Sequence, residues 1–99
     1  MRIKTTRTDI VEVTKVIVTP SGIPDKNSFG KYKDVRCYLE MIWGDKKYER
    51  IHGEFDCKGV DNLEDCEKVS YKFVDELYKD GCIDISTDEK CAEYGLTIY

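Results

Sequence analysis

The segment from Val35 to Trp43 constrains the fold most, because apolar and polar side chains alternate along it as far as Met41. Every odd-numbered position is apolar, whereas Arg36, Tyr38 and Glu40 occupy the even-numbered positions. A period of two is typical of a β-strand with one buried face and one exposed face. The sequence therefore predicts a strand here, with its apolar face toward a core.

A turn at residues 44–46 and a second alternating segment at residues 51–57 predict a β-hairpin. Pairing Leu39 with Ile51 sets apolar side chains against each other, and a slip of one residue would exchange the two faces. On the other face this register places three polar pairs opposite each other: Arg36 with Glu54, Tyr38 with His52, and Glu40 with Arg50. Opposite charges in such positions support the register.

Residues 62–79 are predicted to form the main α-helix. Their apolar side chains recur at helical spacing: Leu63, Cys66, Val69, Phe73 and Leu77. Asp61 is the predicted N-cap, since Glu64 follows it at the spacing of a capping box. Gly81 lies just beyond the helix, where a left-handed residue commonly ends one.

The remaining segments complete an α+β fold. The β-branched run at 9–19 predicts a long first strand, and the prolines and glycines that follow predict a long loop at about 20–34. Residues 82–86 predict a strand that returns along the sheet, 87–94 a short helix, and 96–99 a final strand. We therefore expect one domain over residues 1–99, with a mostly antiparallel sheet of about four to five strands and the main helix packed on one face.

The five cysteines predict free thiols, because their number is odd and no C-x-x-C pair occurs. The first residues alternate between polar and apolar and do not form an apolar export signal, and no stretch approaches the roughly 18 apolar residues of a membrane span. These patterns predict a cytoplasmic protein without a membrane association.

No recognised catalytic, cofactor or metal motif occurs in the sequence. There is no Walker loop, G-x-G-x-x-G, nucleophile elbow or H-E-x-x-H, and the cysteines lack zinc-site spacing. We therefore expect a non-enzymatic chain without cofactor or metal. A small enzyme that uses the single histidine, His52, is the third hypothesis for function.

Charge is distributed unevenly along the chain, with a net +4 over residues 1–50 and −8 over residues 51–99. The acidic excess is concentrated near the end of the sequence, in Asp80, Asp84, Asp88, Glu89 and Glu93. The leading hypothesis is a protein-binding module that docks on a basic or nucleic-acid-binding partner. The most specific version of this hypothesis is an acidic inhibitor that mimics nucleic acid, of the type that phages and mobile elements encode.

Aromatic residues supply a second candidate contact surface. The chain holds seven tyrosines and one tryptophan, and exposed Tyr and Trp are enriched at binding hot spots. The aromatic side chains that are hardest to bury are Trp43, Tyr48, Tyr94 and Tyr99.

The main alternative is a sheet that binds nucleic acid directly. On the polar face of the hairpin it would use cations and stacking rings: Arg36, Tyr38, Tyr48, Arg50 and His52. Glu40 and Glu54 on the same face, and the acidic isoelectric point of about 5.0, argue against this alternative. The sequence leaves the oligomeric state open.

Overall fold

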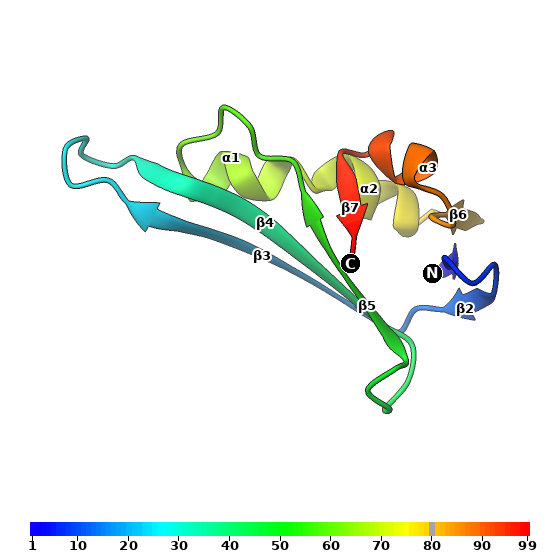
Figure 1. Ribbon diagram of the computed structural model, residues 1–99. Helices are drawn as coiled ribbons and strands as arrows, with labels where there is room; N and C mark the ends of the chain where they lie inside the picture. The colour runs from blue at the N-terminus through cyan, green and yellow to red at the C-terminus, as the bar shows by residue number, and fades with distance from the viewer. Residues whose placement is uncertain (80) are drawn as a thin grey trace.

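The computed structural model describes residues 1–79 and 81–99 and confirms the α+β class (Figure 1). The described residues form seven strands: β1 (Arg2–Lys4), β2 (Ile10–Glu12), β3 (Lys15–Pro24), β4 (Tyr32–Ile42), β5 (Arg50–Phe55), β6 (Cys82–Asp84) and β7 (Leu96–Ile98). They also form three helices: α1 (Leu63–Lys68), α2 (Tyr71–Leu77) and α3 (Asp88–Ala92).

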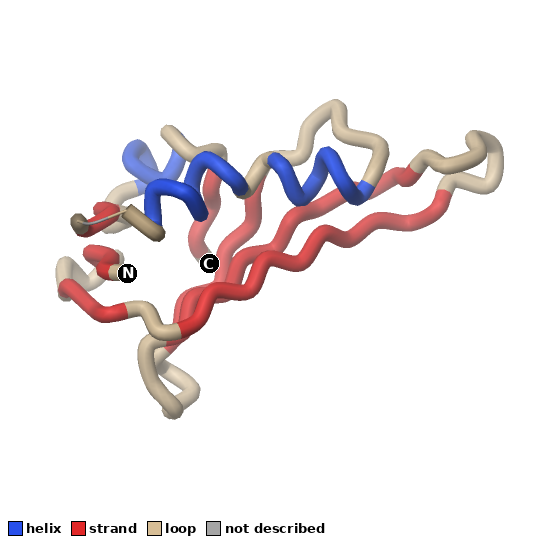
Figure 2. The backbone as a smooth tube through the Cα atoms, turned by 180° about the vertical axis from the view of Figure 1, so that it is seen from behind, coloured by secondary structure: helices blue, strands red, loops and turns tan. Residues whose placement is uncertain are grey.

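The strands make two sheets. The main sheet is antiparallel with the order β3-β4-β5-β7, and the small sheet has the order β2-β1-β6 with β1 and β6 parallel. Figures 1 and 2 show α1 and α2 along one side of the main sheet. In the described part of the chain no helix covers the opposite side of the main sheet (Figure 2).

The core lies between the helix pair and the inner face of the main sheet. Cys37, Leu39 and Met41 of β4 are buried there, as the alternation predicts. From the helix side, Phe73 is fully buried and meets Phe55 edge to face, with 5.9 Å between ring centroids. Burial of these side chains stabilises the sheet–helix contact and leaves the even-numbered positions of β4 outside the core.

The observed register of the β4–β5 hairpin differs from the predicted one by two residues. Leu39 pairs with Gly53 instead of Ile51, and Glu40 pairs with His52 instead of Arg50. The hairpin loop is longer than expected, since Trp43 N–H donates to the Glu49 carbonyl (3.0 Å). A shift of two residues keeps every side chain on its predicted face, because side chains alternate with period two.

The predicted first strand at 9–19 is wrong as one element. It divides at Val13–Thr14 into β2, which joins the small sheet, and β3, which joins the main sheet. Thr14 N–H donates to the Ile42 carbonyl (2.8 Å) at this junction. Because the chain changes sheets there, Ile17 lies on the open side and Val16 packs toward the core.

The loop predicted at about 20–34 is shorter, because β3 continues to Pro24 and β4 begins at Tyr32. Pro20 pairs with Cys37 within the sheet, and the register shifts between Ser21 and Ile23. β3 is an edge strand, where a proline without an N–H is tolerated, and a bulge accommodates the irregular segment.

The main helix is present but bent, and its cap lies one residue later than predicted. Asn62 is the N-cap, and its side chain accepts a hydrogen bond from Asp65 N–H (2.7 Å). Between α1 and α2 the buried Ser70 hydroxyl donates to the Glu67 carbonyl (2.6 Å), and such a bond bends a helix. No helix among residues 1–79 and 81–99 has the length and apolar character needed to cross a bilayer.

The last third of the chain is partly as expected. The 82–86 segment contributes β6 to the small sheet, parallel to β1, instead of returning along the main sheet. The short helix is confirmed as α3, with Thr87 as its N-cap, and the final strand is confirmed as β7, antiparallel to β5.

Candidate functional site: an open sheet face and the groove beside it

The uncovered side of the main sheet carries a mixed aromatic and charged surface, which we call the open face. It comprises the outward side chains of β3, β4 and β5 together with Tyr99: chiefly Ile17, Arg36, Tyr38, Glu40, Arg50, His52, Glu54 and Tyr99. Tyr38, Glu40, His52 and Tyr99 line a shallow hollow of about 190 Å³ on it. The alternation of each strand places these side chains opposite the core.

Two carboxylates hold the charged groups of the open face together. Arg36 Nη1 lies 3.3 Å from Glu54 Oε1, and Arg50 Nη1 lies 3.5 Å from Glu40 Oε1. His52 Nδ1 lies 3.3 Å from the other oxygen of Glu40. The two arginine–glutamate pairs of the sequence prediction therefore exist, but as diagonal neighbours, because of the register shift.

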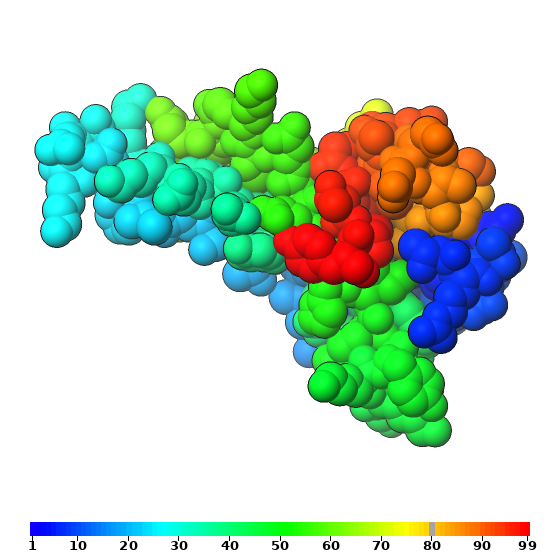
Figure 3. Space-filling model, viewed as in Figure 1, coloured from blue at the N-terminus to red at the C-terminus, as the bar shows by residue number. Residues whose placement is uncertain are grey.

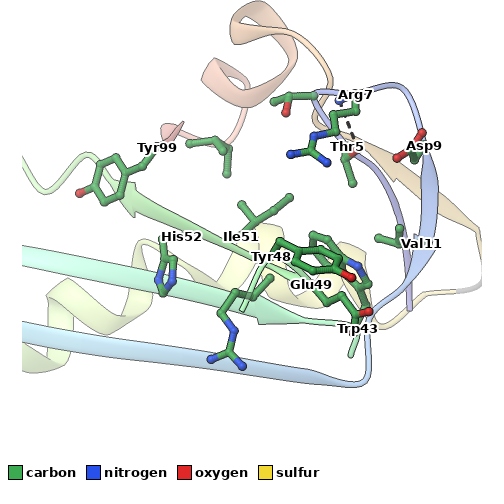
Figure 4. Close-up of a pocket in the computed structure, with 13 residues that line it drawn as sticks. Thr5, Arg7, Asp9, Val11, Trp43, Tyr48, Glu49, Ile51, His52 and Tyr99 are labelled. Carbon is green, nitrogen blue, oxygen red and sulfur yellow. Dashed lines mark hydrogen bonds between the residues drawn. The ribbon is translucent and has the colours of Figure 1, made fainter. Parts of the chain in front are cut away.

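A groove of about 440 Å³ adjoins the open face, between β5 and the β1–β2 hairpin. Figure 3 shows it as a hollow bounded by the N-terminal segment, the C-terminal segment and the β4–β5 hairpin. In Figure 4, Tyr48 and Trp43 form one wall, whereas Thr5 and Arg7 lie across the groove from them. Arg50, His52 and Tyr99 belong to both the groove and the open face, which makes one continuous surface.

The β1–β2 turn sets the position of Arg7 at the groove. Thr5 N–H donates to the Asp9 carbonyl (2.8 Å), and Thr8 N–H donates to the Thr5 carbonyl (2.8 Å). Thr8 adopts a φ of 64°, which costs a non-glycine residue about 1–2 kcal/mol. Arg7 N–H donates to Thr5 Oγ1 (3.3 Å), so the strained turn keeps both side chains on the groove wall.

Comparisons with models of protein families, with curated proteins and with solved structures give no match to this chain.

The structure brings three of the four predicted aromatic residues together. Trp43, Tyr48 and Tyr99 all line the groove. Tyr94 lies elsewhere: its ring packs edge to face on Phe73, with 5.2 Å between centroids, and it supports the core. An exposed patch that includes Tyr94 is therefore not present.

The five residues of the nucleic-acid hypothesis also lie on this continuous surface. Arg36 and Tyr38 are on the open face, and Tyr48, Arg50 and His52 line the groove. The guanidinium groups of Arg36 and Arg50, however, are engaged by Glu54 and Glu40.

The predicted acidic residues do not act alike. Asp80 lies outside the described residues. Asp84 is half-buried and accepts hydrogen bonds from Lys90 Nζ (2.6 Å) and from Ser86, which lower its pKa well below the usual range. Asp84 therefore stabilises the β6–α3 connection. Asp88, Glu89 and Glu93 are exposed on and after α3, away from the groove.

Sequence reasoning missed the N-terminal wall of the groove, formed by Thr5, Arg7, Asp9 and Val11. The available signal was short: a polar stretch at 4–9 between the apolar residues Ile3 and Ile10. Strands of three residues are too brief for alternation to identify them.

The surroundings of His52 indicate its chemistry. Its imidazole is exposed and paired with Glu40, and the hydroxyl groups that line the same hollow belong to Thr19, Tyr38 and Tyr99. Among the described residues, no group of three His, Cys, Asp or Glu side chains gathers to hold a metal ion. The arrangement is suited to polar contacts and stacking with a ligand.

Proposed function

We propose that this chain is a small non-enzymatic protein-binding module whose contact surface is the open face with its groove. The observation that carries the proposal is an uncovered sheet face whose exposed tyrosines adjoin an aromatic-lined cavity. Tyr38, Tyr48 and Tyr99 are 38%, 64% and 70% exposed. Tyr, Trp and Arg are the residue types that dominate binding hot spots.

The charge balance of the surface supports a protein partner over a phosphate backbone. Arg36 and Arg50 are each bonded to a glutamate, so the face offers paired charges and little net positive potential. Nucleic-acid affinity depends on unpaired cations that replace counterions, whereas protein interfaces combine aromatic and arginine side chains with a balanced polar rim. The matching partner surface is apolar at its centre, with hydrogen-bonding groups around it.

Preorganisation also favours this surface as an interface. The ion pairs fix the long side chains of Arg36 and Arg50, and the Tyr99 hydroxyl is bonded to Glu54. Fewer side-chain rotamers are then lost on binding, at about 0.5–1.5 kcal/mol for each immobilised long side chain.

The open face alone is smaller than a standard protein interface, so the proposed contact surface needs the groove as well. β3, β4 and β5 lie about 4.8 Å apart and all three pair along the stretch Cys37–Ile42 of β4, which gives a face of roughly 15 by 20 Å. That is about 300 Å², which is less than the about 800 Å² that each partner buries in a standard interface. The groove supplies additional contact area with Trp43 and Tyr48.

A narrower form of the proposal is that the partner is basic, as the target of an acidic inhibitor would be. Its support is the exposure of Asp88, Glu89 and Glu93 around α3. Asp84 supports it less, because Lys90 neutralises that carboxylate.

The test uses a partner captured from the native host and identified by mass spectrometry. We expect the double variant Tyr38→Ala, Tyr99→Ala to weaken the affinity of that partner about tenfold or more, as measured by calorimetry. The matched control is Tyr71→Ala, Tyr78→Ala, which removes two exposed tyrosines from the helix side. Equal loss in both variants, or in neither, contradicts the proposed surface.

Direct binding of single-stranded nucleic acid is the second candidate. Its support is the hollow that Tyr38, His52 and Tyr99 line, since a base can stack on such rings. Fluorescence anisotropy of a labelled oligonucleotide at low salt tests it. Binding that falls with added salt and is lost in Tyr38→Ala, Tyr99→Ala would replace the protein-partner proposal; no binding would exclude this candidate.

A further inference from the structure

Two cysteine thiols lie in contact where β5 leads into α1. Cys57 Sγ and Cys66 Sγ are 3.5 Å apart, and Cys66 is fully buried on α1. Cys66 Sγ also lies 2.9 Å from the Arg36 carbonyl, to which its thiol donates. Since a thiol has one hydrogen, Cys57 is the donor in the contact between the sulfur atoms.

We propose that Cys57 and Cys66 form a dithiol–disulfide site, which a small disulfide such as oxidised glutathione converts to an intramolecular bond. This inference is independent of the proposed binding function.

The exposure of the two thiols decides which of them reacts first with oxidised glutathione. Cys57 lines an open hollow of about 480 Å³ together with Arg36, Asp56 and Lys58, whereas Cys66 is 0% exposed. The Cys57 thiol loses its proton to solvent, and its sulfur attacks oxidised glutathione, which forms a mixed disulfide and releases one glutathione. The deprotonated Cys66 sulfur then attacks the Cys57 sulfur, forms the protein disulfide and releases the second glutathione. Two protein thiols are oxidised and one glutathione disulfide is reduced.

The chain between the two cysteines can accommodate the bond. A disulfide has an S–S length of about 2.05 Å, so the sulfur atoms must approach by about 1.5 Å. The connecting turn is exposed at Lys58 and Gly59, and a side chain at Gly59 would meet no atom within 4 Å. The turn therefore has open space in which to move.

Among the other cysteines, all of which the structure describes, only Cys37 lies near this pair: burial, followed by its contact with Cys66, raises the pKa of Cys37 to about 12. Cys37 is fully buried in the paired centre of β4, so oxidised glutathione cannot reach it as it reaches Cys57. Cys82 is exposed, and its sulfur lies 3.9 Å from the Ile83 carbonyl. Oxidised glutathione can therefore modify Cys82, but among the described residues Cys82 has no neighbouring thiol that would displace the bound glutathione.

The reaction is expected to be slow at neutral pH. Burial, followed by the contact with Cys66, raises the pKa of Cys57 to about 12. The thiolate is the attacking species, so the rate increases as pH rises.

The experiment uses the folded Cys82→Ser variant with oxidised glutathione at mildly alkaline pH, followed by alkylation of the remaining thiols. Before alkylation we expect an intact mass lower by about 2 Da, from the loss of two hydrogens, and after alkylation and digestion a linked peptide that joins Cys57 to Cys66. The double variant Cys82→Ser, Cys91→Ser, which also lacks the buried Cys91, is the matched control and should give the same link.

The single variants separate this site from unspecific oxidation. Cys66→Ser, or Cys66→Ala if the first does not fold, should stop at one glutathione on Cys57, because the second sulfur is absent. Circular dichroism verifies that each variant is folded. A link that involves Cys37, a wild-type product that retains glutathione on Cys57, or no oxidation under conditions that oxidise the unfolded chain overturns the proposal.

Discussion

The Tyr99 hydroxyl donates a 2.5 Å hydrogen bond to Glu54 Oε2, while the other oxygen of this carboxylate pairs with Arg36. Glu54 thereby connects β4 and β5 with the residue that follows β7. One carboxylate positions an arginine and a tyrosine on the open face, so a change at Glu54 alters both side chains.

The first prediction concerns the ionisation of Tyr99. The hydrogen bond to Glu54 raises the pKa of Tyr99, because the carboxylate accepts from the neutral phenol and repels the phenolate. This stabilisation is complete below the ordinary tyrosine pKa of about 10 and is lost as pH rises through the raised value. We expect Glu54→Gln to lower the Tyr99 pKa in an ultraviolet titration. An unchanged titration in Glu54→Gln would show that the bond does not hold the phenol in solution.

The second prediction concerns acid stability at the β6–α3 connection. Lys90 and Ser86 lower the pKa of Asp84, so its charged form is stabilised in the folded protein. That contribution is present above the ordinary aspartate pKa of about 3.9 and is lost as pH falls toward the lowered value. Asp84→Asn should lower the melting temperature at pH 7, and its difference from wild type should shrink in acid. The exposed neighbour Asp88→Asn serves as the control; an equal effect there would contradict the assignment.

The faces of the main hairpin could be predicted from sequence, but its register could not. Alternation from Val35 to Trp43 identifies which side chains point inward, and the structure agrees. A two-residue shift leaves the faces unchanged and still lets Arg36 reach Glu54 and Arg50 reach Glu40 diagonally. Loop length decides between such registers, and the sequence holds no sharp turn signal such as Asn-Gly at this tip.

The groove could not be predicted as a unit, because its walls come from separate parts of the chain. Residues 5–11 contribute one wall, 43–52 another, and 98–99 the end beside the open face. Local patterns identified Trp43 and Tyr99 as candidates, since large aromatic side chains near turns and ends are hard to bury. Only the packing of the small sheet beside β5 brings Arg7 to the same site.

The third prediction concerns the core beneath the main sheet. Phe73 is fully buried between Phe55 and Tyr94. Phe73→Ala should reduce the free energy of unfolding by about 3–5 kcal/mol, because it removes buried apolar surface and leaves a cavity. Urea denaturation monitored by circular dichroism measures the loss. The helix neighbour Tyr71→Ala, with 46% of Tyr71 exposed, should change stability by about 0.5 kcal/mol or less; similar losses in both variants would contradict the packing.

The fourth prediction separates the two candidate N-caps of the main helix. Asn62 accepts from Asp65 N–H and donates to the Asp65 carboxylate (2.9 Å), whereas Asp61 forms an ion pair with Lys31 (2.6 Å). Asn62→Ala leaves a helix N–H without its partner and should cost about 1 kcal/mol, measured by urea denaturation. Asp61→Ala should have a smaller effect that disappears at high salt, because salt screens an exposed ion pair. If Asp61→Ala were the more damaging change at high salt, the helix would begin with the predicted Asp61 cap after all.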